Sequence, residues 1–83
     1  MNFDQDKIDC LLDFYRNQYP ELVLRYVFNP IGIYINFYIG LKSKKYRDRF
    51  YASMPANEKT ADLVNLCIID FLAELSRKGI PLE

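Results

Sequence analysis

The chain of 83 residues is long enough for one small domain with a single hydrophobic core. Hydrophobic residues make up 51% of it and aromatic residues 16%, which excludes an intrinsically disordered segment. Its 11 basic and 11 acidic residues give a formal charge of zero, so the chain as a whole has no general electrostatic attraction to nucleic acid or to an anionic membrane.

The first segment is predicted to form a helix from about Asp4 to Gln18. Its apolar side chains recur at the spacing of one helical face, and they are Ile8, Leu11, Leu12, Tyr15 and Tyr19. Asn2 or Asp4 can cap the start of this helix, and Pro20 ends it. The helix dipole and a solvated helix face account for its acidic residues, which are Asp4, Asp6, Asp9 and Asp13.

The next two segments are predicted to form a β-hairpin. From Glu21 to Asn29 the hydrophobic period changes to two, and from Ile33 to Lys42 every odd position is apolar. Between them, residues 29–32 read Asn-Pro-Ile-Gly, which suits a type I turn. With a four-residue turn, we expect Phe28 to pair with Ile33, Tyr26 with Ile35, Leu24 with Phe37 and Leu22 with Ile39.

A third strand is predicted from Tyr46 to Ala52, after a polar loop at residues 42–45. Pairing Leu41 with Tyr46 places Phe37 opposite Phe50. The same register points Asp48 toward the core, which fits an edge strand that carries an inward charge against aggregation.

The last segment is predicted to be a helix from Asn57 to Lys78, with Asn57 as its cap and Gly79 at the position after its end. Apolar residues cover more of its circumference than packing on one sheet requires. We expect this helix to lie between the sheet and the first helix, or to meet a second chain. Residues 1–83 thus form a single α+β domain of order α-β-β-β-α, a three-stranded antiparallel meander sheet with two helices packed on one face.

This order of elements resembles that of the double-stranded RNA-binding domain. Such domains carry a Gly-Pro-x-His loop after the first strand and a Lys-Lys-x-Ala-Lys run at the start of the last helix. Here the loop reads Asn-Pro-Ile-Gly at residues 29–32, and the helix opens Asn-Glu-Lys-Thr-Ala at residues 57–61. The resemblance therefore covers the order of elements, and no binding residue of that family is carried over.

Motifs for catalysis are scarce. The chain has no histidine and no Gly-rich phosphate loop, so we expect no enzyme, no catalytic residue, no cofactor and no metal site; a site made of carboxylates alone is the weakest alternative. Cys10 and Cys67 lack the spacing of a zinc site and are expected to be buried thiols, with a bridge between them as the alternative. An acidic N-terminus without a long apolar run predicts a cytoplasmic protein with no membrane partner.

The second strand directs its even-numbered residues to a sheet face that no predicted helix covers. Tyrosine, arginine and asparagine gather there, next to a basic loop. The predicted partner-binding residues are Arg25, Tyr34, Asn36, Tyr38, Lys44, Lys45, Arg47, Arg49 and Tyr51. In the predicted register Tyr38 neighbours Arg49 and Asn36 neighbours Tyr51, so that a guanidinium can lie over a ring.

Two functions fit this surface. One is a small protein-interaction module, a regulator or inhibitor that binds another protein and self-associates as a homodimer through the last helix or the open sheet face. The alternative is a nucleic-acid-binding domain, in which the tyrosines stack on bases and the basic residues contact phosphates. Against both stands the simpler interpretation that tyrosine and arginine are favourable cross-strand neighbours on a solvated sheet.

Overall fold

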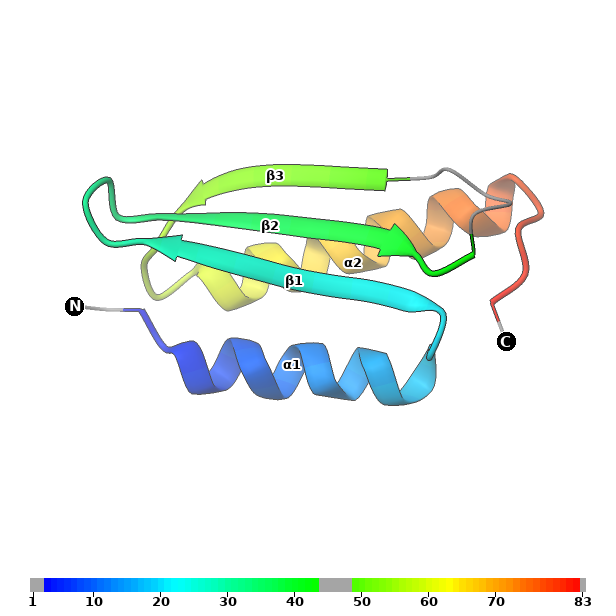
Figure 1. Ribbon diagram of the computed structural model, residues 1–83, viewed down its shortest axis with the longest axis horizontal. Coiled ribbons are helices and arrows are strands. Elements are labelled where there is room, and N and C mark those ends of the chain that lie inside the picture. Colours follow the sequence, from blue (N-terminus) through cyan, green and yellow to red (C-terminus); the bar gives the residue numbers. More distant parts are fainter. Residues whose placement is uncertain (1–2, 44–48, 83) are drawn as a thin grey trace.

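The computed structural model describes residues 3–43 and 49–82 of the chain. Its elements are α1 (Gln5–Gln18), β1 (Leu22–Asn29), β2 (Tyr34–Leu41), β3 (Arg49–Pro55) and α2 (Thr60–Arg77) (Figure 1). The strands form one antiparallel sheet in the order β1-β2-β3. This architecture confirms the predicted α+β class and the predicted order of elements.

Helix α1 forms where the sequence predicts it. The side chain of Asp4 caps it, since its Oδ1 accepts a hydrogen bond from the backbone N–H of Lys7 at 3.0 Å. Ile8 and Leu12 are buried on one face of the helix. The helix stops before Pro20, and the N–H of Leu22 donates to the carbonyl of Tyr19 at 2.9 Å, which leads the chain directly into β1.

The hairpin of β1 and β2 forms, but its predicted register is wrong by two residues. Phe28 pairs with Ile35, and Asn29 with Tyr34. The reason lies in the turn, where Ile33 has a φ of 55° and belongs to the turn instead of the strand. The Asn29 carboxamide closes this turn, because it accepts hydrogen bonds from the N–H groups of Ile31 at 3.0 Å and Gly32 at 3.4 Å. A shift of two residues leaves every side chain on its predicted face.

The register of β2 with β3 is also two residues away from the prediction. Phe37 pairs with Ala52 and Ile39 with Phe50, so the predicted pair of Phe37 with Phe50 is wrong. The strand continues past its predicted end at Ala52 as far as Pro55, because Met54 extends the buried side of the strand. Asp48, with the first residues of the predicted strand, lies outside the described residues.

The core lies between one face of the sheet and the two helices. α1 contacts β1 and α2, and α2 contacts β2 and β3, so both helices cover the same face (Figure 1). The sheet contributes the buried side chains of Leu22, Leu24, Ile35, Phe37, Ile39 and Met54. From α2 the buried residues are Thr60, Ala61, Val64, Ile68, Phe71 and Leu75. The opposite face of the sheet is uncovered in the described part of the chain.

Both ends of α2 are shaped by local hydrogen bonds. The helix begins at Thr60, so the prediction that Asn57 caps it is wrong; the Asn57 carboxamide instead accepts from the N–H of Lys59 at 2.8 Å, within a turn. At the other end, Gly79 follows the helix with a φ of 71°, as predicted. The N–H of Ile80 donates to the carbonyl of Leu75 at 3.0 Å and that of Gly79 to Ser76 at 3.1 Å, which completes a Schellman motif.

Candidate binding surface

The candidate surface is the sheet face that points away from the helices, called the open face below. Alternation along the three strands fixes its members. They are Val23, Arg25, Val27, Asn29, Tyr34, Asn36, Tyr38, Gly40, Arg49, Tyr51, Ser53 and Pro55. The described part of the predicted site, which is Arg25, Tyr34, Asn36, Tyr38, Arg49 and Tyr51, lies on this face as predicted by the period of two. Lys44, Lys45 and Arg47 lie outside the described residues.

A row of three side chains crosses the middle of the open face. Arg25 on β1 is opposite Tyr38 on β2, which in turn is opposite Tyr51 on β3. The guanidinium carbon of Arg25 lies 4.6 Å from the centre of the Tyr38 ring, within cation–π distance. The rings of Tyr38 and Tyr51 are 5.1 Å apart between their centres and inclined by 49°. Each side chain of the row therefore contacts the next one, which restricts its conformation.

The neighbours in this row differ from the predicted ones. Tyr38 was expected beside Arg49, and the structure places Arg49 opposite Gly40. The cation–π contact forms with Arg25 instead, because the two-residue shift of the hairpin moves Arg25 opposite Tyr38. Asn36 is opposite Val27 and Ser53, yet it still meets Tyr51 on the diagonal. The Tyr51 hydroxyl donates a hydrogen bond to Asn36 Oδ1 at 3.1 Å.

Charge is distributed unequally between the two layers of the molecule. Among its described residues, the open face carries the guanidinium groups of Arg25 and Arg49 and no carboxylate. On the helical layer, α1 carries a group of exposed carboxylates close to its N-terminus, with Asp4 at the cap. The open face is therefore the basic side of a chain whose formal charge is zero.

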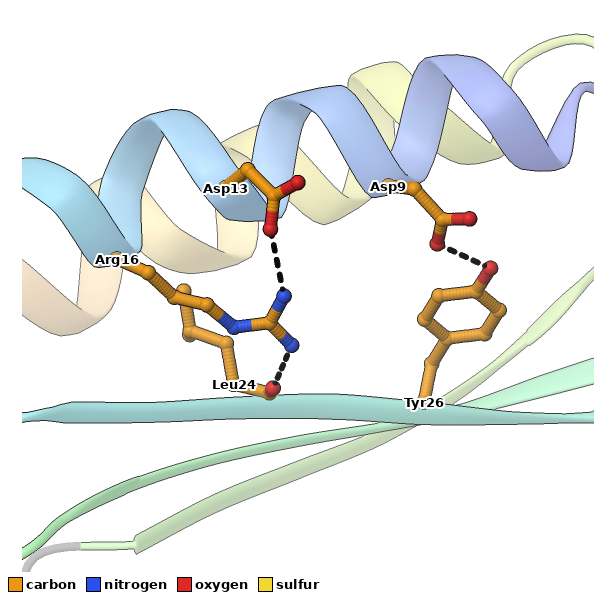
Figure 2. Close-up of polar contacts among 5 residues, drawn as sticks. All are labelled: Asp9, Asp13, Arg16, Leu24 and Tyr26. Atoms are coloured by element: carbon orange, nitrogen blue, oxygen red, sulfur yellow. Dashed lines mark hydrogen bonds and ion pairs between the residues drawn. The ribbon is translucent and has the colours of Figure 1, made fainter.

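The acidic residues of α1 also join the helix to the sheet, which sequence reasoning missed (Figure 2). The Tyr26 hydroxyl donates a hydrogen bond to Asp9 Oδ1 at 2.7 Å. Arg16 forms an ion pair with Asp13 at 3.0 Å and donates a second hydrogen bond to the backbone carbonyl of Leu24. Burial, and next the hydrogen bond to the Asp9 carboxylate, raise the pKa of Tyr26 to about 12. The sequence did contain a signal for the bond between Tyr26 and Asp9: a tyrosine on the core face of β1 needs a polar partner for its hydroxyl.

Shallow grooves lie at both edges of the sheet in the described part of the chain. One, of about 260 Å³, runs between the start of β3 and the end of α2, and it is lined by Arg49, Phe50, Asp70, Phe71, Glu74, Leu75 and Lys78. The other, of about 300 Å³, lies beside β1 and is lined by Arg16, Pro20, Leu22, Val23, Leu24 and Lys42. Within residues 3–43 and 49–82, no three side chains of the histidine, cysteine, aspartate and glutamate types gather closely enough to hold a metal ion.

Both cysteines are free thiols, so the alternative of a disulfide between them is not realised. Cys67 is half-buried, and burial together with the charge of Asp70 raises the pKa of its thiol. The expectation that Cys10 is buried is wrong, because α1 turns Ile8 and Leu12 toward the sheet and leaves Cys10 exposed. None of the described helices is both long enough and apolar enough to cross a membrane.

Comparison of the sequence and the structure with protein-family models, with curated proteins and with solved structures gave no match. The site therefore has to be interpreted from its own geometry. That geometry defines a class of surface: an aromatic and basic face on a small open sheet, supported from behind by two helices.

Proposed function

We propose that this chain is a non-enzymatic protein-interaction module, a regulator or inhibitor that binds another protein through the open face. The observation that carries the proposal is the row of Arg25, Tyr38 and Tyr51 on a sheet face that the described chain leaves uncovered. Tyrosine and arginine are enriched at protein interfaces, above all at the positions that contribute most to binding.

The row is organised before any partner arrives, which favours binding. The contact of Arg25 with Tyr38 and the hydrogen bond of Tyr51 with Asn36 already restrict these side chains. Ordering a free side chain at an interface costs about 0.5–1.5 kcal/mol, and restricted side chains avoid part of that cost. Tyr51 is nevertheless 57% exposed and Tyr34 48% exposed, so both rings retain area that a partner can bury.

The chemistry around the row indicates the kind of partner. Arg25 has no carboxylate beside it on the described open face, so a partner with acidic side chains would complement it. Arg49 shares a groove with the carboxylates of Asp70 and Glu74. Val23 and Val27 are exposed on either side of Arg25 and form an interrupted apolar strip along β1. An apolar strip beside basic groups suits a protein surface that combines carboxylates with aliphatic side chains.

A nucleic-acid partner is the second candidate, and one observation favours it. Tyr34, Tyr38 and Tyr51 present three rings on a sheet together with two arginines, and aromatic rings on a sheet can stack on unpaired bases. The valine strip and the zero formal charge of the whole chain support the protein candidate over this one. We place the module in a reducing cytoplasm, with which its two free thiols are compatible.

Capture from an extract of the source cells with the intact chain as bait tests the proposal. Arg25→Ala and Tyr38→Ala remove the row without touching the outer edge of β3. Phe14→Ala is the matched control, because Phe14 is 56% exposed and lies on α1, in the helical layer. We expect a captured protein to be retained by the control and to lose about tenfold or more in affinity with either open-face variant.

Titration with nucleic acid separates the two candidates. Mixed-sequence single-stranded RNA and DNA serve as probes, titrated at low and at physiological salt. Binding that weakens steeply with salt, and that disappears in a variant carrying both Arg25→Ala and Arg49→Ala, would replace the protein candidate with the nucleic-acid candidate. Capture that is equally strong for the control and for both open-face variants would exclude the open face as the binding surface.

A further inference from the structure

The two outer edges of the sheet are not equivalent. At the β1 edge, two of the backbone groups that point away from the sheet are already engaged, one by the end of α1 and one by the segment after it. The N–H of Leu22 donates to the carbonyl of Tyr19. The carbonyl of Leu24 accepts a hydrogen bond from the Arg16 side chain (Figure 2). The part of this edge at Leu22 and Leu24 is therefore occupied by the protein itself, which is one way in which native sheets avoid pairing with other chains.

Within the described residues, the middle of the β3 edge has no such hydrogen bonds. The N–H of Ala56 donates to the carbonyl of Ile33 at 2.9 Å, which fixes the hydrogen-bonding pattern between β3 and β2. Because hydrogen-bonded pairs alternate along an antiparallel ladder, the backbone N–H and C=O groups of Phe50, Ala52 and Met54 point toward β2. The backbone groups of Arg49, Tyr51 and Ser53 consequently point outward. Among the described residues, no hydrogen bond engages the outward N–H and C=O groups of Tyr51 and Ser53.

The middle of β3 also lacks the side chains that usually discourage strand pairing. Residues 50–54 read Phe-Tyr-Ala-Ser-Met, with no charge and no proline. Arg49 and Pro55 stand at the two ends of the strand. Charged residues, prolines and inward-pointing charges are the usual protective features of an edge, and the middle of this one has none.

We propose that β3 pairs antiparallel with β3 of a second copy of the chain, with Tyr51 opposite Tyr51 of the second copy. The two three-stranded sheets then become one continuous sheet. In this register Arg49 faces Ser53 of the second copy, so all three outward-pointing residues of each strand exchange their N–H and C=O groups. A register moved toward the C-terminus brings in Pro55, which has no N–H to donate.

Two features make a second copy of the chain fit this edge. Residues directly opposite each other in antiparallel strands point to the same side, so the row of Arg25, Tyr38 and Tyr51 continues across the symmetry axis into the same row of the second copy. In addition, this register separates the two Arg49 side chains by about 14 Å along the strands. That distance exceeds the Debye length of about 8 Å at physiological salt, so the repulsion between the two charges is largely screened. A dimer formed face to face would instead place two basic faces against each other.

Sedimentation velocity of the intact chain over a range of concentrations tests the inference, with a mass of 9.9 kDa expected for one copy and twice that mass for the pair. Ser53→Pro removes an outward N–H that the monomer does not use, and proline is tolerated at such edge positions. Ser53→Ala keeps the N–H and is the matched control. We expect the dimer dissociation constant to rise by about 100-fold in Ser53→Pro and to stay within about threefold in Ser53→Ala.

Circular dichroism and unfolding of Ser53→Pro establish whether the variant is folded. Amide hydrogen exchange of the unmodified chain gives a second readout that needs no variant: the N–H of Tyr51 should exchange more slowly as the concentration rises through the dimer range. A chain that stays monomeric at millimolar concentration would overturn the inference. So would a dimer that Ser53→Pro leaves intact while Leu66→Lys, on the exposed side of α2, dissociates it.

The inference stands apart from the proposed partner binding. Arg25→Ala and Tyr38→Ala change side chains on β1 and β2 and leave the backbone of β3 intact, whereas Ser53→Pro removes an N–H at the β3 edge. A monomeric Ser53→Pro chain that still captures the partner would support both proposals. A dimer without a captured partner would support the pairing of β3 alone.

Discussion

The Tyr26 hydroxyl on β1 donates its hydrogen bond to the carboxylate of Asp9 on α1 at 2.7 Å, and this contact joins the first helix to the sheet (Figure 2). Burial first, and then the bond to Asp9, raise the pKa of Tyr26 from 10.0 to about 12. The folded state thus holds the proton more tightly than the unfolded state does. The stabilisation is complete below pH 10.0 and is lost as the pH rises through about 12, so the free energy of unfolding should decrease across this range.

Asp9→Asn separates the two causes of this shift. The amide oxygen can still accept the hydrogen bond, but the negative charge is gone, so the pKa of Tyr26 should fall and yet stay above its ordinary value because burial persists. The ultraviolet absorbance of tyrosinate follows this titration. The step of the titration curve that disappears in Tyr26→Phe belongs to Tyr26. Asp62→Asn on α2 is the control. A titration curve that Asp9→Asn leaves unchanged would contradict the role of this carboxylate.

Thr60 is the one buried polar residue among the described residues, and its hydroxyl joins two segments of backbone. It donates to the carbonyl of Pro55 at 2.9 Å and accepts from the N–H of Asn57 at 2.8 Å. Thr60→Val keeps the shape and removes both bonds, so we expect a loss of about 1–3 kcal/mol in the free energy of unfolding. Thr60→Ser keeps the hydroxyl and should lose less. Equal losses in the two variants would show that the hydroxyl is unimportant.

The two glycines at positions 40 and 79 form a natural comparison of backbone conformation. An added Cβ would meet nothing within 4 Å at either position, but Gly79 has a φ of 71°. Gly79→Ala should therefore destabilise the protein by about 1 kcal/mol, because alanine at this φ is strained. Gly40→Ala should be neutral, or stabilising by about 0.4–1 kcal/mol. Denaturant unfolding measures both, and a neutral Gly79→Ala would contradict the role of the left-handed turn.

Phe37 is at the centre of the core, with no exposed surface. Phe37→Ala should reduce the free energy of unfolding by about 3–5 kcal/mol, since it removes a ring and leaves a cavity. Phe14→Ala deletes the same side chain at an exposed position on α1 and should cost about 1 kcal/mol or less. Losses of similar size in the two variants would argue against the position of the core between sheet and helices.

Local sequence patterns predicted the helices, the strands and the faces of the sheet correctly. They did not predict the registers of the strands, which depend on how the strands pair in three dimensions. Alternation placed Tyr34 and Tyr38 on the open face correctly, because a period of two fixes a face whatever the register. The same property hides the register: a shift by two residues keeps every apolar residue inside. The positive φ of Ile33 resolves this ambiguity, and nothing in the local sequence marks an isoleucine for that conformation.

The candidate site shows the same division. The described residues of the predicted site lie on the predicted face of the sheet, but the cation–π partner of Tyr38 was predicted wrongly, because that assignment needs the register. The hydrogen bonds that join Asp9 to Tyr26 and Arg16 to the carbonyl of Leu24 were not predicted, for a further reason. They depend on the angle at which α1 crosses β1, and helical periodicity alone does not determine that angle.

The meander has a consequence for how the chain folds. Each strand pairs with the strand that precedes or follows it, so both hairpins can form by closing short loops. The docking of α1 on α2 is different: the Tyr15 hydroxyl donates to Asn65 Oδ1 at 2.6 Å, across a sequence separation of 50 residues. Closing that long loop costs little additional conformational entropy once the sheet has brought the two helices to one side. We therefore expect the sheet to assemble before the helices meet, with the contact between Tyr15 and Asn65 among the last to form.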